Sequence, residues 1–216
     1  MGMRMIQTSL RQFAMFLAIA VTALTVHPAY AEDKAPDVVI KSLLSDFQDT
    51  IKNDKDIQGG DTAKVVSLVN SLIMPNVDFE RMTAAAVGPP WGQASPQQQK
   101  RIQEEFKILL VRVYAGAMAR LKDQTISMKP FKAAAEDKEV LVRAEVKGAR
   151  DTIQLDYKME KTPGQGAGWR IYNLKVLGVW LVESYRSQFA QEISTKGVDG
   201  LIAALSDLNK ANSKKS

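Results

Sequence analysis

Apolar residues recur with a helical period from Pro36 to about Lys122. The first helix is predicted to begin at Pro36, because proline suits the first turn, and to end in the polar stretch 53–60. Its apolar face comprises Val39, Leu43, Leu44, Phe47 and Ile51. A second helix is predicted from Asp61 or Thr62 to Pro75, and a short third one from about Asp78 to Gly88.

The clearest helix start in the chain is at Ser95. Ser95 is a good N-cap, Pro96 suits the first helical position, and Gln98 follows at the spacing that completes a capping box. The helix predicted from this start runs to about Lys122 and buries Ile102, Phe106, Leu109, Leu110, Val113 and Leu121. A stripe this broad indicates contact with more than one neighbouring element.

The period changes from 3.6 to 2 after residue 124. Apolar and polar residues alternate along 140–147 and along 153–159, which predicts two strands with one apolar face each. A third strand is predicted from Trp169 to about Leu177, and an edge strand over 124–130. Short turns separate these segments, so we predict a four-stranded, twisted antiparallel sheet over about 124–177.

A helical period returns after Gly178 and halts at Gly197, which predicts C-terminal helices over about 180–210. Helices over about 36–122 therefore precede the sheet, and further helices follow it. This order predicts an α+β fold in which helices cover one face of the sheet.

The N-terminus has the pattern of a secretory signal peptide. Arg4 and Arg11 come before the apolar run 13–26, and an A-x-A site ends at Ala31, directly before charged residues. The apolar run is short for a membrane span. We therefore expect residues 1–31 to be cleaved and residues 32–216 to form one soluble periplasmic unit.

The composition limits which catalytic and ligand-binding side chains residues 32–216 can supply. The chain has no cysteine, and its one histidine, His27, lies in the predicted signal peptide, so the remainder has neither imidazole nor thiol. Removing residues 1–31 also lowers the formal charge from +5 to about +3, because Arg4 and Arg11 leave without any acid. This small charge gives no support for nucleic-acid binding, and the missing side chains favour a binding protein over an enzyme.

Motifs that resemble known sites fail on inspection. The glycines of 164–168 lack the third glycine of a dinucleotide loop and precede a strand, so we predict a hairpin turn. Asp54 and Asp56 resemble the start of a calcium loop, but Val65 stands where the bidentate Glu is needed. Glu145 and Asp156 alternate outward from the sheet and are expected to be solvated. We predict no catalytic residue and no metal site.

Two blocks of sequence carry a family resemblance. The first comprises residues 74–82, Gly88, Trp91, Ala94–Gln98, Phe106 and 110–114, and the second comprises 169–173, Gly178 and 184–189. In order and spacing they resemble the MlaC, or toluene-tolerance, family of periplasmic phospholipid-binding proteins. The resemblance covers nearly all of the chain after the signal peptide.

The resemblance implies a soluble carrier of phospholipid. It implies an α+β fold with an apolar cavity between sheet and helices, which holds the acyl chains and leaves the head group near solvent. The implied partners are phospholipid, an inner-membrane Mla-type ABC transporter complex and an outer-membrane lipoprotein–porin complex. The transport would maintain the lipid asymmetry of the outer membrane. No cofactor other than the lipid cargo is implied, and a monomer is expected.

Inward-facing strand residues and the helix that faces them are the candidates for the cavity wall. They are Leu110, Val113, Tyr114, Met118, Val140, Val142, Ile153, Leu155, Tyr157, Leu174 and Val176. Such positions also form ordinary dry cores, and the pattern does not separate the two. Tyr114 and Tyr157 are candidates to place hydroxyls at the rim, and Arg186 is a candidate phosphate ligand, although packing roles are open for all three.

Two alternatives to a carrier remain open at this stage. One is a periplasmic isomerase or dehydratase that uses a buried carboxylate as its base. It has little support, because none of the predicted inward strand positions is acidic. The other is an adaptor without a ligand, which predicts a filled core.

Overall fold

The computed structural model describes residues 34–148 and 152–213, which belong to one compact unit spanning Ala31–Ser216. The predicted signal peptide lies outside the described residues. Among the described residues, no helix combines the length and apolar character that crossing a bilayer requires.

The N-terminal helices form an antiparallel pair. Helix α1 (Pro36–Asn53) is followed by the single turn α2 (Lys55–Gln58) and by α3 (Thr62–Leu68). Helix α3 continues through a π turn, η1 (Val69–Ile73), and a 3-10 turn, η2 (Met74–Asn76). The second predicted helix therefore begins and ends where expected, but its final turns loosen before Pro75, which has no backbone N–H to continue the helix.

The middle of the chain is dominated by one long helix. The short helix α4 (Phe79–Val87) and the 3-10 turn η3 (Pro89–Gln93) lead into α5 (Pro96–Ala119) and η4 (Arg120–Asp123). The capping box predicted at Ser95 is present: the Gln98 N–H donates to the Ser95 hydroxyl at 3.2 Å, and the Ser95 N–H donates to the Gln98 side chain at 2.9 Å.

The sheet is antiparallel with strands in sequential order. Its strands are β1 (Thr125–Met128), β2 (Glu139–Lys147), β3 (Thr152–Lys161), β4 (Trp169–Val176) and β5 (Val179–Trp180). The predicted hairpin turn between β3 and β4 is confirmed, since the Thr162 N–H donates to the Gly168 carbonyl at 2.8 Å.

The sheet has five strands, so the predicted number of four is wrong. The fifth strand, β5, pairs with the end of β4 after a two-residue turn at Leu177 and Gly178, and both turn residues have positive φ, 52° and 82°. Two residues are too few to show a period of 2, so the pattern predicts no strand here and places the C-terminal helix directly after Gly178.

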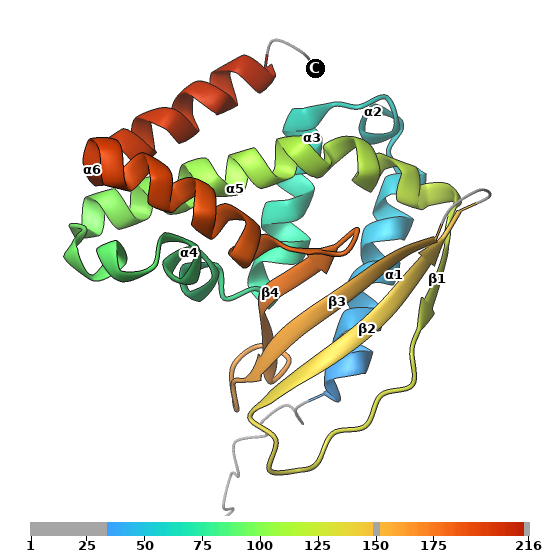
Figure 1. Cartoon of the computed structure of the whole chain (residues 1–216). Coiled ribbons are helices and arrows are strands. Elements are labelled where there is room, and N and C mark those ends of the chain that lie inside the picture. Colours follow the sequence, from blue (N-terminus) through green and yellow to red (C-terminus); the bar gives the residue numbers. More distant parts are fainter. Residues whose placement is uncertain (1–33, 149–151, 214–216) are drawn as a thin grey trace, which may run out of the picture. The chain divides into compact units, whose positions relative to one another are not determined.

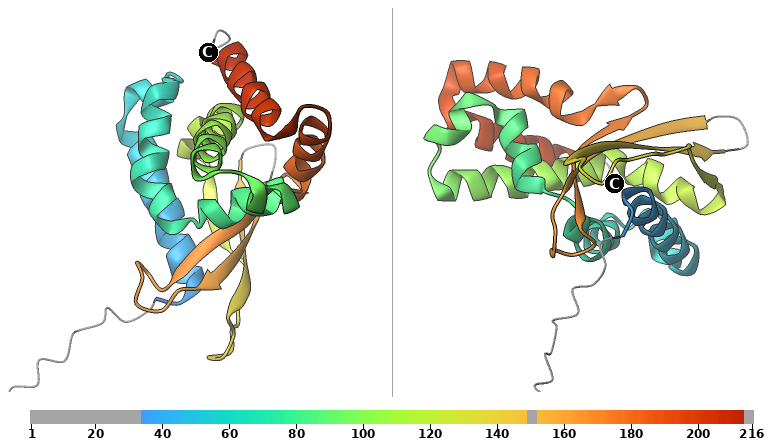
Figure 2. Two further views of the ribbon diagram at one scale, coloured as in Figure 1. Left: turned by 90° about the vertical axis from the view of Figure 1, so that its left-hand side faces the viewer. Right: turned by 90° about the horizontal axis from the view of Figure 1, so that it is seen from below.

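Helix α6 (Leu181–Ser213) is broken at Gly197, whose φ of 70° is non-helical. The predicted halt at Gly197 is confirmed. Beyond the break, α6 is held on α5 by a buried contact in which the Asn209 amide donates to the Glu105 carbonyl oxygen at 2.9 Å and to its carboxylate at 2.7 Å. Figure 2 shows α5 between α3 on one side and α6 on the other.

The helices bury one face of the sheet. Val142, Ala144 and Val146 on the inner face of β2 are at most 1% exposed, whereas Arg143 and Lys147 on the other face are exposed. Helix α1 lies against β1 and β2 (Figure 1), and α4 and α6 contact β4. The core centres on Phe106, whose ring lies 4.9–5.7 Å from those of Phe79, Tyr185 and Phe189.

One expectation for the outer face of the sheet is wrong. Asp156 was expected to be solvated, but it is only 4% exposed. Its register partners on the neighbouring strands are Arg143 and Lys175, and its carboxylate lies 3.8 Å from the Lys175 ammonium. Gln154 also donates to it at 2.8 Å. Long side chains from both neighbouring strands therefore cover and pair this carboxylate.

A cluster around Arg81 ties α4 to the sheet. The Arg81 guanidinium pairs with Glu139 at 2.6 Å and with Glu160, and it lies 3.7 Å from the centre of the Tyr172 ring. Hydrogen bonding from Arg81, and less from Tyr172, lowers the pKa of Glu139. Burial, together with a hydrogen bond to Asp78, raises the pKa of Glu160 in spite of the pairing with Arg81.

Candidate functional site

An apolar cavity of about 210 Å³ lies between the inner face of the sheet and the helices. A single buried water needs roughly 10–15 Å³ of accessible volume, so this space is an order of magnitude larger than a water site. The described residues that line it are Leu43, Leu44, Phe47, Val69, Ile73, Met74, Val77, Phe79, Met82, Lys107, Leu110, Val111, Tyr114, Ala117, Met118, Leu121, Val146, Ile153, Leu155, Tyr157, Ile171, Leu174, Val176 and Leu181.

Helix α5 and strand β3 supply opposite sides of the wall through their two different periods. On α5 the wall residues from Lys107 to Leu121 recur at spacings of three and four, which places them on one helix face. On β3, Ile153, Leu155 and Tyr157 alternate with outward-facing residues. The cavity therefore exists because an apolar stripe and an apolar sheet face are held apart instead of packing together.

Eight of the residues predicted for the wall lie on it. They are Leu110, Tyr114, Met118, Ile153, Leu155, Tyr157, Leu174 and Val176. They come from α5 and from the hairpin of β3 and β4, which is distant from α5 in the sequence, and the fold brings them to one space.

The other three residues predicted for the wall, Val113, Val140 and Val142, are not among the described residues that line the cavity. Val113 is 52% exposed. At 3.6 residues per turn it lies roughly 100° around α5 from the centre of the wall stripe. Val142 is 1% exposed and Val140 is partly buried, and both pack in the main core. On β2 the cavity borders Val146, and on β3 it borders Ile153, Leu155 and Tyr157.

Sequence reasoning missed the contribution of the N-terminal helices. Leu43, Leu44 and Phe47 of α1 and Val69 and Ile73 of η1 close another side of the cavity. Their apolar spacing predicted burial, but spacing within one helix does not tell a cavity wall from a packed core. Lys107 was also missed, although its position seven residues before Tyr114 places it on the same face of α5.

The polar side chains on the described part of the wall are Lys107, Tyr114 and Tyr157. Tyr157 is 5% exposed, so its ring does not lie at a rim as suggested, and burial raises the pKa of its hydroxyl far above the usual range. Burial also raises the pKa of Tyr114. The pKa of Tyr185 is raised by burial and, to a smaller extent, by the nearby Tyr114 hydroxyl. All three tyrosines therefore stay neutral at physiological pH.

Arg186, the candidate phosphate ligand, and the aromatic residues Phe79 and Trp91 make packing contacts within the protein. Arg186 is not on the cavity wall, and its Nε donates to the Ala85 carbonyl of α4 at 2.9 Å. This hydrogen bond ties α6 to α4. Phe79 both lines the cavity and contacts Phe106, while Trp91 packs partly buried against the main core.

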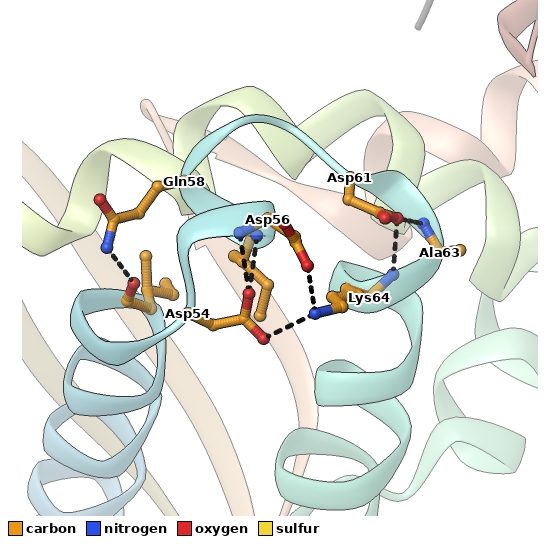
Figure 3. A network of polar contacts seen from close by, with 8 residues as sticks. Asp54, Asp56, Gln58, Asp61, Ala63 and Lys64 are labelled. Carbon is orange, nitrogen blue, oxygen red and sulfur yellow. Dashed lines mark hydrogen bonds and ion pairs between the residues drawn. The ribbon is translucent and has the colours of Figure 1, made fainter.

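The segment that resembles a calcium loop is occupied by helix caps and ion pairs (Figure 3). The Asp54 carboxylate accepts from the N–H groups of Asp56 and Ile57, and Asp61 caps α3 in the same way. The Lys64 ammonium lies 3.4 Å from Asp54 and 2.5 Å from Asp56. A lysine thus occupies the position between the carboxylates, and no cluster of potential metal ligands is found within the described residues.

Comparisons with known proteins agree on one family. The model of the family described as MlaC protein matches residues 41–207. The chain is 25% identical over 168 residues to the toluene tolerance protein ttg2D of Pseudomonas putida, which covers 77% of this chain and 76% of that protein. It is 22% identical over 199 residues to the intermembrane phospholipid transport system binding protein MlaC of Haemophilus influenzae, which covers 91% and 92%.

A solved structure gives the same result at higher identity. The phospholipid-binding protein from Ralstonia solanacearum, in complex with a phospholipid, is 42% identical and superposes with a TM-score of 0.79. The match covers 83% of this chain and 99% of that chain.

Proposed function

The chain belongs to the MlaC family, and from this membership and its apolar cavity we propose that it is a phospholipid carrier. The observation that carries the proposal is the cavity wall, which is apolar apart from one lysine and two tyrosines among the described residues. The similar protein from Ralstonia solanacearum, with the same fold, was solved with a phospholipid bound.

The energetics of acyl chains require a wall of this kind. Moving one methylene out of water is worth roughly 0.8 kcal/mol, so two long chains represent on the order of 20 kcal/mol. A carrier in water must enclose them. A cavity about as apolar as the bilayer makes loading and unloading nearly balanced in free energy, so that the partners decide where the lipid goes.

We propose that the acyl chains contact the wall residues from α5 and the sheet together with those from α1 and η1. The central contacts are Leu110, Met118, Leu155 and Leu174. Methionines at 74, 82 and 118 also line the cavity. Their flexible side chains suit a wall that accepts acyl chains of different shape.

The proposed route runs through the periplasm, between an outer-membrane lipoprotein–porin complex and an inner-membrane Mla-type ABC transporter complex. The signal-peptide pattern of residues 1–31 supports the compartment, and the relative from Haemophilus influenzae is named as part of an intermembrane transport system. The carrier is proposed to work as a monomer and to maintain the lipid asymmetry of the outer membrane.

The alternatives receive no support from the site. An isomerase or dehydratase needs a buried carboxylate as its base, and none of the described wall residues is acidic. An adaptor without a ligand predicts a filled core, and the space between sheet and helices is open instead.

Native mass spectrometry tests the binding function. The protein purified from a Gram-negative periplasm is expected to carry one stoichiometric phospholipid adduct, which denaturation releases for identification. A protein that arrives bare and also refuses added phospholipid would contradict the proposal.

A reconstituted transfer assay tests the route. Labelled phospholipid is placed in vesicles that carry one membrane complex, and vesicles that carry the other complex serve as acceptors. Transfer should require the carrier and both complexes. Equal transfer by vesicles lacking either complex would show that the partners are wrong, even if lipid binding is correct.

A further inference from the structure

Lys107 is the single charged side chain among the described residues that line the cavity. It lies in the first half of α5, on the helix face that continues through Leu110, Tyr114 and Leu121. A charge on an otherwise apolar wall is costly unless it reaches water or an opposite charge. The role of Lys107 therefore depends on what its ammonium meets.

Lys107 has no partner within the described part of the protein. It is partly buried, and no hydrogen bond or ion pair is made by its ammonium. Every other partly buried lysine or arginine in the described ranges has a partner, for example Lys122 with Gln58 and Lys175 with Asp156. The acid one turn before it, Glu104, instead lies 4.0 Å from Arg101.

The position of Lys107 along the cavity suits a lipid head group. From Lys107 to Leu121 the wall stripe of α5 extends about 21 Å, at 1.5 Å per residue. The acyl region of one bilayer leaflet is about 15 Å thick, half of the hydrocarbon core. An acyl chain that lies along this stripe is therefore shorter than the stripe. Lys107 lies at one end of the stripe, beyond the length that the chain occupies.

We propose that Lys107 binds the anionic phosphodiester of the cargo lipid and thereby sets the orientation of the lipid in the cavity. This assignment rests on the proposed function. The four-carbon stem of Lys107 packs at the edge of the apolar wall, and its ammonium donates charge-assisted hydrogen bonds to the phosphate oxygens. The phosphate of the bound lipid is then the ion partner of Lys107. As a result, the protein discriminates phospholipids from phosphate-free lipids with the same chains.

The test compares two lipids that differ in the phosphate. Lipid-free full-length mature protein is offered an equal mixture of phosphatidylglycerol and diacylglycerol with the same acyl chains, and native mass spectrometry gives the ratio of the two adducts. Wild-type protein is expected to prefer the phospholipid. Lys107→Met keeps an unbranched apolar stem without the charge, and it should reduce that preference by on the order of tenfold.

Matched variants separate the charge from structural effects. Lys107→Arg should retain most of the preference, because it keeps a cationic donor. Lys100→Met, which removes an exposed lysine from the same helix, should leave the ratio unchanged. Circular dichroism and the melting temperature of each variant report whether the fold is intact.

The outcomes distinguish this assignment from the function on which it rests. If wild-type protein binds neither lipid, the proposed function fails. If wild-type protein prefers phosphatidylglycerol and a folded Lys107→Met variant shows the same ratio, lipid binding stands and the assignment of Lys107 is overturned. Adding millimolar inorganic phosphate should leave the wild-type ratio unchanged. A loss of the preference under that condition would assign Lys107 to a free anion instead of the head group.

Discussion

Replacing Leu155 with Asp places a carboxyl group directly on the cavity wall. Leu155 lies on the inner face of β3 and is only partly buried, so the lipid-free protein can hydrate the new carboxylate without losing its fold. A bound acyl chain removes that water. The carboxyl group is then expected to protonate when lipid binds, because an unpaired charge among hydrocarbon is far more costly than the neutral acid.

Protonation sets the size of the effect. An ordinary Asp has a pKa of about 3.9, and each pH unit above it costs about 1.36 kcal/mol to bind the proton. At pH 7 the penalty is about 4 kcal/mol, which is roughly a thousandfold loss of affinity. The penalty falls by about 1.36 kcal/mol for each unit by which the pH falls, so that lowering the pH from 7 to 5 should restore about a hundredfold in affinity.

The assay is a titration of fluorescent phospholipid into lipid-free protein at several pH values. Leu155→Asn has nearly the same shape as the Asp variant but does not titrate, so its affinity should be independent of pH. Thr152→Asp places the same charge on an exposed position of β3 and should bind like wild type. If folded Leu155→Asp binds lipid normally at pH 7, or if its loss of affinity does not depend on pH, the placement of the acyl chains against β3 is wrong.

Three further predictions concern stability in urea. Leu177→Asn should stabilise the protein by about 1 kcal/mol, because Leu177 is 67% exposed and has a positive φ that Asn tolerates better; an unchanged midpoint would argue against strain in this turn. Phe106→Ala should cost about 3–5 kcal/mol, since it empties the centre of the aromatic core; a loss below 1 kcal/mol would mean that the core is not centred there. Glu139 has a lowered pKa in the folded state, so its contribution is present above about pH 4.5 and is lost as the pH falls through the folded value. Glu139→Gln should therefore flatten the stability profile between about pH 5 and pH 3, by less than about 1 kcal/mol for a surface pair, and an identical profile would contradict the role of Arg81.

Features that depend on a few neighbouring residues were predictable. The capping box at Ser95 and the halt of α6 at Gly197 involve contacts within one turn of chain, and both are present. The strand β5 was not predictable in this way, because two residues carry no periodic signal and among the described residues β5 pairs with the end of β4 alone. Asp156 likewise needed its cross-strand neighbours, because one strand alone does not show that cations flank it on both sides.

For the cavity wall as well, local spacing predicted some features and contacts between distant segments decided the others. Period 3.6 on α5 and period 2 on β3 determined which side chains face inward, and Leu110, Tyr114 and Leu155, which these periods place inward, lie on the wall. Whether the inward face meets another element or an open space depends on the distance between elements. Val142 packs in the main core cluster, whereas Ile153 on the same face of the sheet borders the cavity.

The sequence by itself determined most of the secondary structure, the face that most elements bury and the absence of histidine and cysteine after residue 27, because these are properties of composition and local spacing. Only the tertiary structure decided that α1, η1, α5 and the sheet enclose a space of about 210 Å³, and that Lys107 lies on its wall without a partner among the described residues. Both depend on how far apart surfaces from distant segments are held, and hydrophobic spacing along one chain segment does not encode that distance.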